Sequence, residues 1–309
     1  MKIVVIGSSN IDMVARVSRL PLPGETVGGA QFLQSLGGKG ANQAVAAARL
    51  GGDVTFVTSL GNDIYADMLR RCFDAEGIRT DYVMNDAGNP TGSALIMVAD
   101  SGENCIAVAP GANSSLLLKH MKQLKSLIEE AEIVVMQAEI PYVTIKEVAL
   151  LVRRAGKKLL FNPAPACSID EELMKSVGVL VVNEVEASFI SGMEYTGNNY
   201  REMALQLIKK GARQVVITLG SQGVYMESKY ESLYLPGHRV NVSDTTAAGD
   251  TFCGALAVSY AQGNIDEEAL KFANAAAAIS VTRSGAQSSI PIRKEVEIFL
   301  QSHENSIVV

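Results

Sequence analysis

The chain has 309 residues, of which 48% are hydrophobic and 19% charged, with 27 glycines and 9 prolines. This composition fits a compact α/β protein and excludes a disordered or fibrous one. The net charge of −6 supplies no positive field for a nucleic acid backbone, so we expect no nucleic acid partner. We find no apolar segment of membrane-spanning length and no signal-peptide core, and therefore expect a cytoplasmic protein without a membrane partner.

Short apolar runs alternate along the chain with amphipathic stretches that end in glycine. Helical patterns cover 40–52 and 62–77, and the chain turns helical from Asp250 onward. This alternation is typical of βαβ units, so we predict an α/β fold in one domain, 1–309: a Rossmann-like, mostly parallel central sheet flanked by helices. The clearest strand patterns, apolar on both faces, are 2–7 (KIVVIG), 53–60 (DVTFVTSL), 131–137 (AEIVVMQ), 157–162 (KKLLFN), 178–183 (GVLVVN) and 213–220 (RQVVITLG).

Two segments, 12–36 and 91–108, interrupt this alternation because neither has a helical period. The second reads as a strand, a DSGEN turn and a further strand, so we predict that both segments form one small β-sheet. They leave the main domain near strand ends, which favours a discontinuous lid over the site. Residues 94–98 (ALIMV) are apolar on both faces, so the alternative is an ordinary hairpin packed on the main domain. We favour a lid that also binds a second copy of the chain, as a homodimer.

Polar residues and glycines follow most of the predicted strands. Ligands of an open parallel sheet bind beyond the carboxyl ends of its strands, so these residues are candidates for one shared site. A single polar residue at a strand end is usually a turn former or a helix cap, and this alternative stays open for each asparagine taken alone. The set comprises Asn10 and Asp12, Glu139, Asn162, Asn183 and Glu186, and Gly220 and Gly223.

Two glycine-rich motifs were compared with common nucleotide signatures. GSSNID, after the first strand, lacks GxGxxG, which argues against a dinucleotide-binding fold. GGKGAN, residues 37–42, has Gly40 where a phosphate-binding P-loop needs Ser or Thr, which argues against a Walker-type NTPase. We expect its glycines to let the backbone approach a ligand closely, with Lys39 and Asn42 as hydrogen-bond donors.

The stretch SDTTAAGDTF, residues 243–252, precedes an apolar helical run. In one interpretation Asp250 is only a helix cap, since Asp suits the positive end of a helix dipole. In the other, Ala247, Ala248 and Gly249 leave several backbone amides uncovered, which makes an anion site. This stretch alone leaves the cap interpretation ahead.

Taken together, the motifs resemble those of the phosphofructokinase B-type carbohydrate kinases over nearly the whole chain. GSSNID, PLPGET, GGKGANQAVAAARLG, NPAPA, NEVEA, TLGSQG, DTTAAGDTFCGAL and AAAAISVTRSGAQSSIP occur in the family's order. The wider family often has Gly at the Ala247 position, and AAGD is similar to its ribokinase branch. The resemblance implies that ATP phosphorylates D-ribose at the 5-hydroxyl, giving D-ribose 5-phosphate and ADP.

The same resemblance implies a role for each candidate residue. Asp250, expected to be ionised at neutral pH, takes the proton of the sugar hydroxyl, and the amides of Ala247, Ala248 and Gly249 form an anion hole for the moving phosphoryl group. The sugar is assigned to Asn10, Asp12, Gly38, Lys39, Asn42 and Glu139, beside Asp250. ATP is assigned to Asn183, Thr218, Gly220, Gly223, Gly249 and Asn274, and Mg²⁺, indirectly, to Glu186.

Ribokinases also carry an activating monovalent cation, so the resemblance implies a K⁺ site beside the anion hole. The matching residues are Asp244, Thr246, Ser280, Arg283, Gly285 and Ser289. Most ligands there are backbone carbonyls, which the sequence specifies weakly. One alternative is a related kinase acting on deoxyribose, adenosine or a hexose. Another is a non-catalytic sugar-binding relative, which we rank low because the base and the anion-hole glycine are intact.

Overall fold

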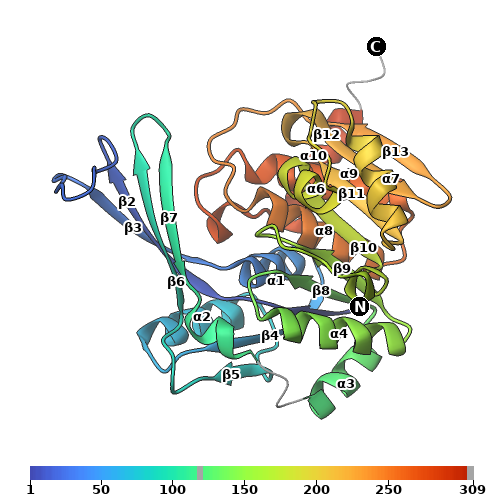
Figure 1. The fold of residues 1–309 in the computed structure, drawn as a ribbon, viewed down its shortest axis with the longest axis horizontal. Helices are drawn as coiled ribbons and strands as arrows, with labels where there is room; N and C mark the ends of the chain where they lie inside the picture. The colour runs from blue at the N-terminus through green and yellow to red at the C-terminus, as the bar shows by residue number, and fades with distance from the viewer. Residues whose placement is uncertain (117–120, 305–309) are drawn as a thin grey trace.

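The computed structural model describes residues 1–116 and 121–304, whose strands form two β-sheets (Figure 1). The central sheet has nine strands in the order β13-β12-β11-β10-β9-β8-β1-β4-β5. In this order, all neighbouring strands between β11 and β5 pair in parallel, whereas β12 and β13 extend the β11 edge in antiparallel pairing. The strands are β1 (Lys2–Ile6), β4 (Asp53–Leu60), β5 (Val83–Asn85), β8 (Ile133–Gln137), β9 (Lys158–Asn162), β10 (Val179–Asn183), β11 (Gln214–Thr218), β12 (Gly223–Ser228) and β13 (Ser232–Pro236).

Helices cover both faces of the central sheet, which confirms the predicted mostly parallel α/β fold (Figure 1). One face packs against α1 (Lys39–Arg49), α2 (Ile64–Ala75), α8 (Ala248–Ala261), α9 (Asp266–Ser280) and α10 (Arg293–Glu304). The other packs against α3 (Met121–Glu130), α4 (Tyr142–Arg154), α5 (Glu171–Met174), α6 (Glu184–Ser191) and α7 (Tyr200–Lys209). Within the described ranges, none of these helices has the length and hydropathy needed to cross a membrane.

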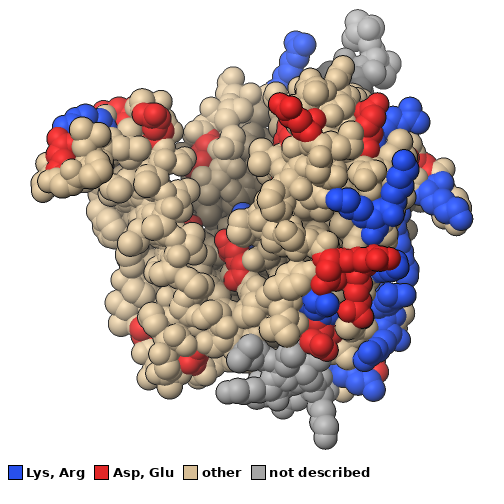
Figure 2. Space-filling view, in the orientation of Figure 1, with Lys and Arg blue, Asp and Glu red and all other residues tan. Residues whose placement is uncertain are grey.

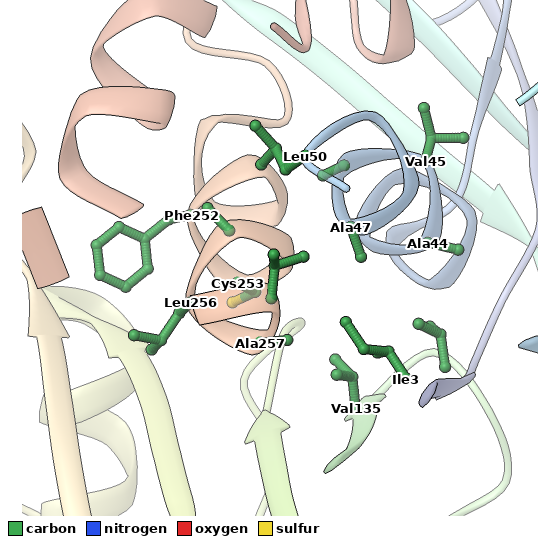
Figure 3. Close-up of a cluster of buried hydrophobic side chains, with 14 of the residues drawn as sticks. Ile3, Ala44, Val45, Ala47, Leu50, Val135, Phe252, Cys253, Leu256 and Ala257 are labelled. Carbon is green, nitrogen blue, oxygen red and sulfur yellow. The ribbon is translucent and has the colours of Figure 1, made fainter. Parts of the chain in front are cut away.

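The strands are apolar on both faces because alternate residues enter two separate cores. In β1, Ile3 packs with α1 and α8 (Figure 3). Val4 packs against the helices of the opposite face. The contact between α1 and α8 is so close that a Cβ added at Gly254 would lie 2.5 Å from the Ala46 Cβ. Small residues therefore let α1 and α8 pack closely near the middle of each helix.

A second sheet of four strands stands beside the central sheet (Figure 1). Its order is β3-β2-β6-β7, with β2 and β6 parallel and the two outer pairs antiparallel. Its strands are β2 (Asn10–Val17), β3 (Gln31–Gly37), β6 (Gly92–Ala99) and β7 (Asn104–Ala109). The two segments expected to pair thus form one sheet, which begins at Asn10 because the chain passes almost directly from β1 into β2. Its role as a lid stays a prediction.

Candidate active site

Asp250 lies buried in the first turn of α8, against the start of α1. Helix α8 begins after Ala247, and the Asp250 side chain makes no capping hydrogen bond. Instead, Asn42 Nδ2 donates to Oδ2 of Asp250 and Gln43 Nε2 donates to Oδ1, each over 2.9 Å. The interpretation of Asp250 as a simple helix cap is therefore wrong.

The environment of Asp250 acts on its pKa in opposite directions. Burial is the largest influence and raises the pKa, whereas Lys39 and the side-chain amides of Asn42 and Gln43 lower it. From the sequence we expected bare amides at the helix start to keep this carboxylate ionised, but its stabilising donors come from α1. A raised pKa makes a carboxylate a stronger proton acceptor once it is ionised.

The backbone before Asp250 forms a sharp turn at the wall of an inner cavity. Ala247 has a φ of 59°, in the left-handed region that L-residues other than glycine rarely adopt. The amide of Ala248 donates to the Thr245 carbonyl over 3.2 Å, so this turn uses one of the three amides predicted for the anion hole. Ala247, Ala248 and Gly249 all line the cavity, together with Asp250.

The residues predicted to bind the sugar lie near Asp250 on three segments: β2, the start of α1 and the turn after β8. Glu139 is held by the Ser8 hydroxyl, which donates to Oε2 over 2.6 Å, and by the backbone amide of Lys39, which donates over 3.0 Å. Asn42 contacts Asp250 directly. The complete set is Asn10 and Asp12 of β2, Gly38, Lys39 and Asn42 at α1, and Glu139.

Three acidic side chains surround the Lys39 ammonium at this end of the sheet. Burial, Glu139 and Asp250 together raise the pKa of Asp12 to about 6, and Lys39 opposes them. Burial lowers the pKa of Lys39. Asp250, Glu139 and Glu186 raise it by more, so the pKa of Lys39 lies above its usual value. Alternating acceptors and donors of this kind suit a ligand that carries several hydroxyl groups.

The glycines of GGKGAN allow close packing within the protein. A Cβ at Gly37 would lie 2.2 Å from the Asp12 carboxylate, and one at Gly40 would lie 2.5 Å from the Ser8 amide nitrogen. Gly38, with a φ of 90°, packs equally closely against the start of β2. These residues therefore let the loop pack against the protein backbone and Asp12, and their close approach to a ligand stays a prediction.

A cleft of about 740 Å³ opens on the other side of Asp250, within the size range of small-molecule sites. It adjoins the inner cavity of about 210 Å³, and both are lined by Thr218, Ala248 and Gly249. Figure 2 shows a hollow between the small sheet and the rest of the molecule. The residues predicted to bind ATP all line the larger cleft: Asn183, Thr218, Gly220, Gly223, Gly249 and Asn274.

Glu186 has a structural role and also lines the inner cavity. It forms a capping box at the start of α6: its carboxylate accepts from the Asn183 amide over 3.0 Å, and its own amide donates to the Asn183 side chain over 2.8 Å. Burial raises the pKa of Glu186, and Lys39 lowers it. The negative charge of this buried carboxylate is only partly compensated by its neighbours. Such a carboxylate next to the inner cavity fits a divalent cation.

The predicted cation residues lie in the loop before α8 and in the segment from the end of α9 to Ser289, and these two segments hydrogen-bond to each other. Asp244 accepts from the backbone and hydroxyl of Thr246, and across the loops from the Gly285 amide over 2.9 Å. The Ser280 carbonyl accepts from the Arg283 amide, while the Arg283 side chain turns away to pair with Glu295. The remaining member, Ser289, is buried in the short helix η4 (Gln287–Ser289). The carboxylate, hydroxyl and backbone carbonyl oxygens of these residues are the kind of ligand that a hard cation prefers.

Several residues of the site escaped prediction from sequence. Gln43 and Gln137 are completely buried near Asp250, and Asn113 contacts Asn10. A glutamine on the otherwise apolar face of an alanine-rich helix was the available signal for Gln43. Asn162 was a candidate for the shared site as a strand-end residue but was given no ligand, and it lines the inner cavity.

A cluster of polar side chains suited to a polyhydroxy ligand, joined through one buried carboxylate to a nucleotide-sized cleft, is the arrangement of a carbohydrate kinase. The family model described as pfkB family carbohydrate kinase matches residues 1–293, and the chain belongs to this family. It is 40% identical over 298 residues to a ribokinase of Haemophilus influenzae, covering 96% of this chain and 97% of the relative. A deoxyribokinase of Salmonella typhi is 34% identical, with 98% and 100% covered.

A solved structure has the same fold and adds a ligand-bound relative. The Arabidopsis thaliana ribokinase, solved as a complex with ribose and ATP, superposes with a TM-score of 0.90. It is 35% identical to this chain, and the match covers 96% of this chain and 98% of the Arabidopsis chain.

Proposed function

We propose that the protein phosphorylates D-ribose at the 5-hydroxyl with ATP, releasing D-ribose 5-phosphate and ADP. The position of Asp250 carries this proposal: it contacts Asn42 of the sugar set and adjoins Gly249 of the nucleotide cleft. The ribokinases among its relatives, one of them solved with ribose and ATP, support the choice of substrates.

Asp250 acts as the base in this proposal. It accepts the proton of the sugar hydroxyl while the oxygen attacks the γ-phosphate and the bond to ADP breaks. The amides of Ala247 and Gly249 stabilise the charge that develops on the transferred group. The amide of Ala248 joins them when it exchanges its hydrogen bond within the turn for one to this group. Lys39 adds positive potential from the sugar side, since it lines the same inner cavity.

We propose that both Mg²⁺ and K⁺ assist this reaction. Glu186 would hold Mg²⁺ indirectly and Asn183 would help to position the phosphates, whose charge the ion would neutralise. The two loops of Asp244 and Gly285 would hold K⁺ next to the turn that carries Ala247 and so stabilise that turn. Equal turnover in K⁺-containing and K⁺-free buffers would contradict the potassium site.

We propose a cytoplasmic homodimer that forms through the small sheet. On the face of the small sheet that carries Asp12, Val108 lies in the same cross-strand row as Asp12. The next row on this face contains Leu33 and Ile106. Leu33, Ile106 and Val108 are each at least half exposed, and the sheet carries few charged side chains below its tip (Figure 2). Light scattering should find a dimer for the native protein and a monomer for Ile106→Glu; a native monomer would contradict the proposal.

ADP release in the presence of different sugars tests the activity. We expect ribose to give the highest kcat/KM among ribose, deoxyribose, adenosine and fructose, and Asp250→Asn to lower kcat by about a thousand-fold or more while folding normally. A higher kcat/KM for deoxyribose would favour the second candidate, which the deoxyribokinase relative suggests. Substantial turnover by Asp250→Asn would contradict the assigned base. Ribose binding without turnover by the native protein would indicate a binding protein.

A further inference from the structure

We propose that Gln43 is a positioning residue that fixes the orientation of the Asp250 carboxylate, and that Gln137 and Asn162 orient Gln43 in turn. This inference rests on the function proposed above for Asp250. Gln43 is completely buried in α1, behind the carboxylate. It therefore supports Asp250 without being drawn away by a ligand, whereas Asn42 belongs to the sugar set.

The Gln43 side chain is held by hydrogen bonds from both of its polar atoms. Nε2 donates to Asp250 Oδ1 over 2.9 Å and to Asn162 Oδ1 over 3.2 Å, which uses both of its hydrogens. Oε1 accepts from Gln137 Nε2 over 2.7 Å. A reversed Gln43 amide would direct an oxygen at the carboxylate and at the Asn162 oxygen. The three contacts therefore permit one orientation of this amide.

The supporting amides are themselves fixed to the central sheet. Gln137 and Asn162 are register partners at the ends of the parallel strands β8 and β9. Asn162 Nδ2 donates to the Val181 carbonyl of β10 over 2.9 Å, which sets the orientation of that amide. The line of hydrogen bonds thus runs from the sheet backbone, through Asn162 and Gln43, to Asp250.

One atom of this network is left without a hydrogen bond. Among the described residues, the buried Oε1 of Gln137 has no partner, and it lies so close to Gly7 that a Cβ there would be 2.0 Å away. A buried unsatisfied oxygen is unfavourable for folding. A network that keeps such an atom is better explained by its effect on Asp250 than by stability.

Fixing the carboxylate matters because the terminal torsion of an aspartate is broad. With Asn42 as the only donor, the carboxylate could pivot about its Oδ2 contact. The second donor, on Oδ1, restrains that rotation, so the remaining lone pairs keep one direction. A base held in this way has less misalignment to overcome when it meets the sugar hydroxyl.

The variant Gln43→Met tests the proposal because it keeps the length of the side chain and removes the donor. We expect kcat with saturating ribose and ATP to fall about ten-fold or more, with KM for each substrate within about three-fold of the native value. Gln137→Met should lower kcat by a smaller factor, since Gln43 keeps its donor and loses only its orienting partner. Gln214→Met, at another buried glutamine of the sheet, is the matched control and should keep kcat within about two-fold.

Circular dichroism and melting temperatures would show whether each variant folds. The positioning role is overturned if folded Gln43→Met keeps the native kcat, if only KM changes, or if Gln214→Met loses as much kcat. Should Gln43→Met fail to fold, native kcat in Gln137→Met overturns the role by itself. The proposed function is judged separately: turnover by Asp250→Asn would end it, whereas loss of turnover there with native kcat in Gln43→Met ends only the positioning role.

Discussion

Asn113 donates from its side-chain amide to the side-chain oxygen of Asn10 over 2.8 Å, which leaves the NH₂ group of Asn10 for a ligand. Asn113 belongs to the short helix η1 (Gly111–Ser115) and also exchanges two hydrogen bonds with the backbone of Ser9. A residue that is absent from the predicted sugar set thus determines how a member of that set presents its amide.

Asn113→Ala should weaken ribose binding selectively. The change removes three buried hydrogen bonds, so we expect the free energy of unfolding to fall by about 2–3 kcal/mol. Because Asn10 loses its fixed orientation, the KM for ribose should rise about ten-fold while the KM for ATP stays nearly constant. Steady-state kinetics and urea unfolding measure both. The control is Asn264→Ala, which removes a hydrogen bond to Ser259 elsewhere; an equal rise in its ribose KM would contradict this explanation.

Asp12→Asn should stabilise the ligand-free protein above pH 6 while lowering its activity. The pKa of Asp12 is raised from 3.8 to about 6, so between these values the unfolded chain loses its proton first and the free energy of unfolding falls as pH rises. The full shift of the Asp12 pKa corresponds to a loss of roughly 3 kcal/mol in the free energy of unfolding. We expect Asp12→Asn to restore about 1–2 kcal/mol of this loss, because the amide of the new side chain is itself partly buried.

Urea unfolding at pH 4 and pH 7.5 checks this pH dependence. The free energy of unfolding of Asp12→Asn should exceed that of the native protein by more at pH 7.5 than at pH 4, since the native carboxylate is ionised at pH 7.5. The exposed Asp81→Asn serves as control and should show no comparable gain. An advantage that is equal at both pH values would mean that ionisation of Asp12 does not limit stability.

Substitutions at Ala247 should separate backbone strain from chemistry. Its φ of 59° suits glycine, so Ala247→Gly relieves about 1 kcal/mol of strain and loses a similar amount to the freer unfolded chain. We therefore expect stability within about 0.5 kcal/mol of the native value and nearly native kcat. Ala247→Val, with a β-branched side chain, should cost about 2 kcal/mol or more and lower kcat by displacing the amides. Equal behaviour of the two variants would show that this turn is not strained.

Gly40→Ala should disturb the sugar side through the backbone. The added methyl group would lie 2.5 Å from the Ser8 nitrogen and 2.6 Å from the Gly7 carbonyl carbon, neither of which can move without shifting the end of β1. We expect a loss of about 1–3 kcal/mol and a higher KM for ribose. Gly28→Ala, which meets no atom within 4 Å, is the control for thermal melts and kinetics. A Gly40→Ala variant as stable as this control would contradict the packing argument.

The sequence predicts the fold well because the fold follows from local patterns. Buried strands and the residues directly after them can be recognised one by one, and parallel pairing then brings their carboxyl ends together. Thr218 and Gly220, for example, lie at the end of β11 and line the cleft, and their binding of ATP stays a prediction. The NEVE motif contains its capping box within four consecutive residues, Asn183 to Glu186.

The polar network behind Asp250 could not be predicted because its members are far apart in the chain. Gln43 and Asp250 are 207 residues apart, and within α1 the glutamine occupies a position that its neighbours fill with alanine. Asn113 belongs to a turn rather than a strand end, so no rule about sheets points to it. The close packing of Gly37 and Gly40 also depends on segments brought together only by the fold.

The side chains of the hydrogen-bond network behind Asp250 (Gln43, Gln137 and Asn162) are all carboxamides, and a carboxamide neither gains nor loses a proton in water near neutrality. Acidification therefore lowers the fraction of Asp250 that is ionised, but it does not change the carboxamides that orient the Asp250 side chain.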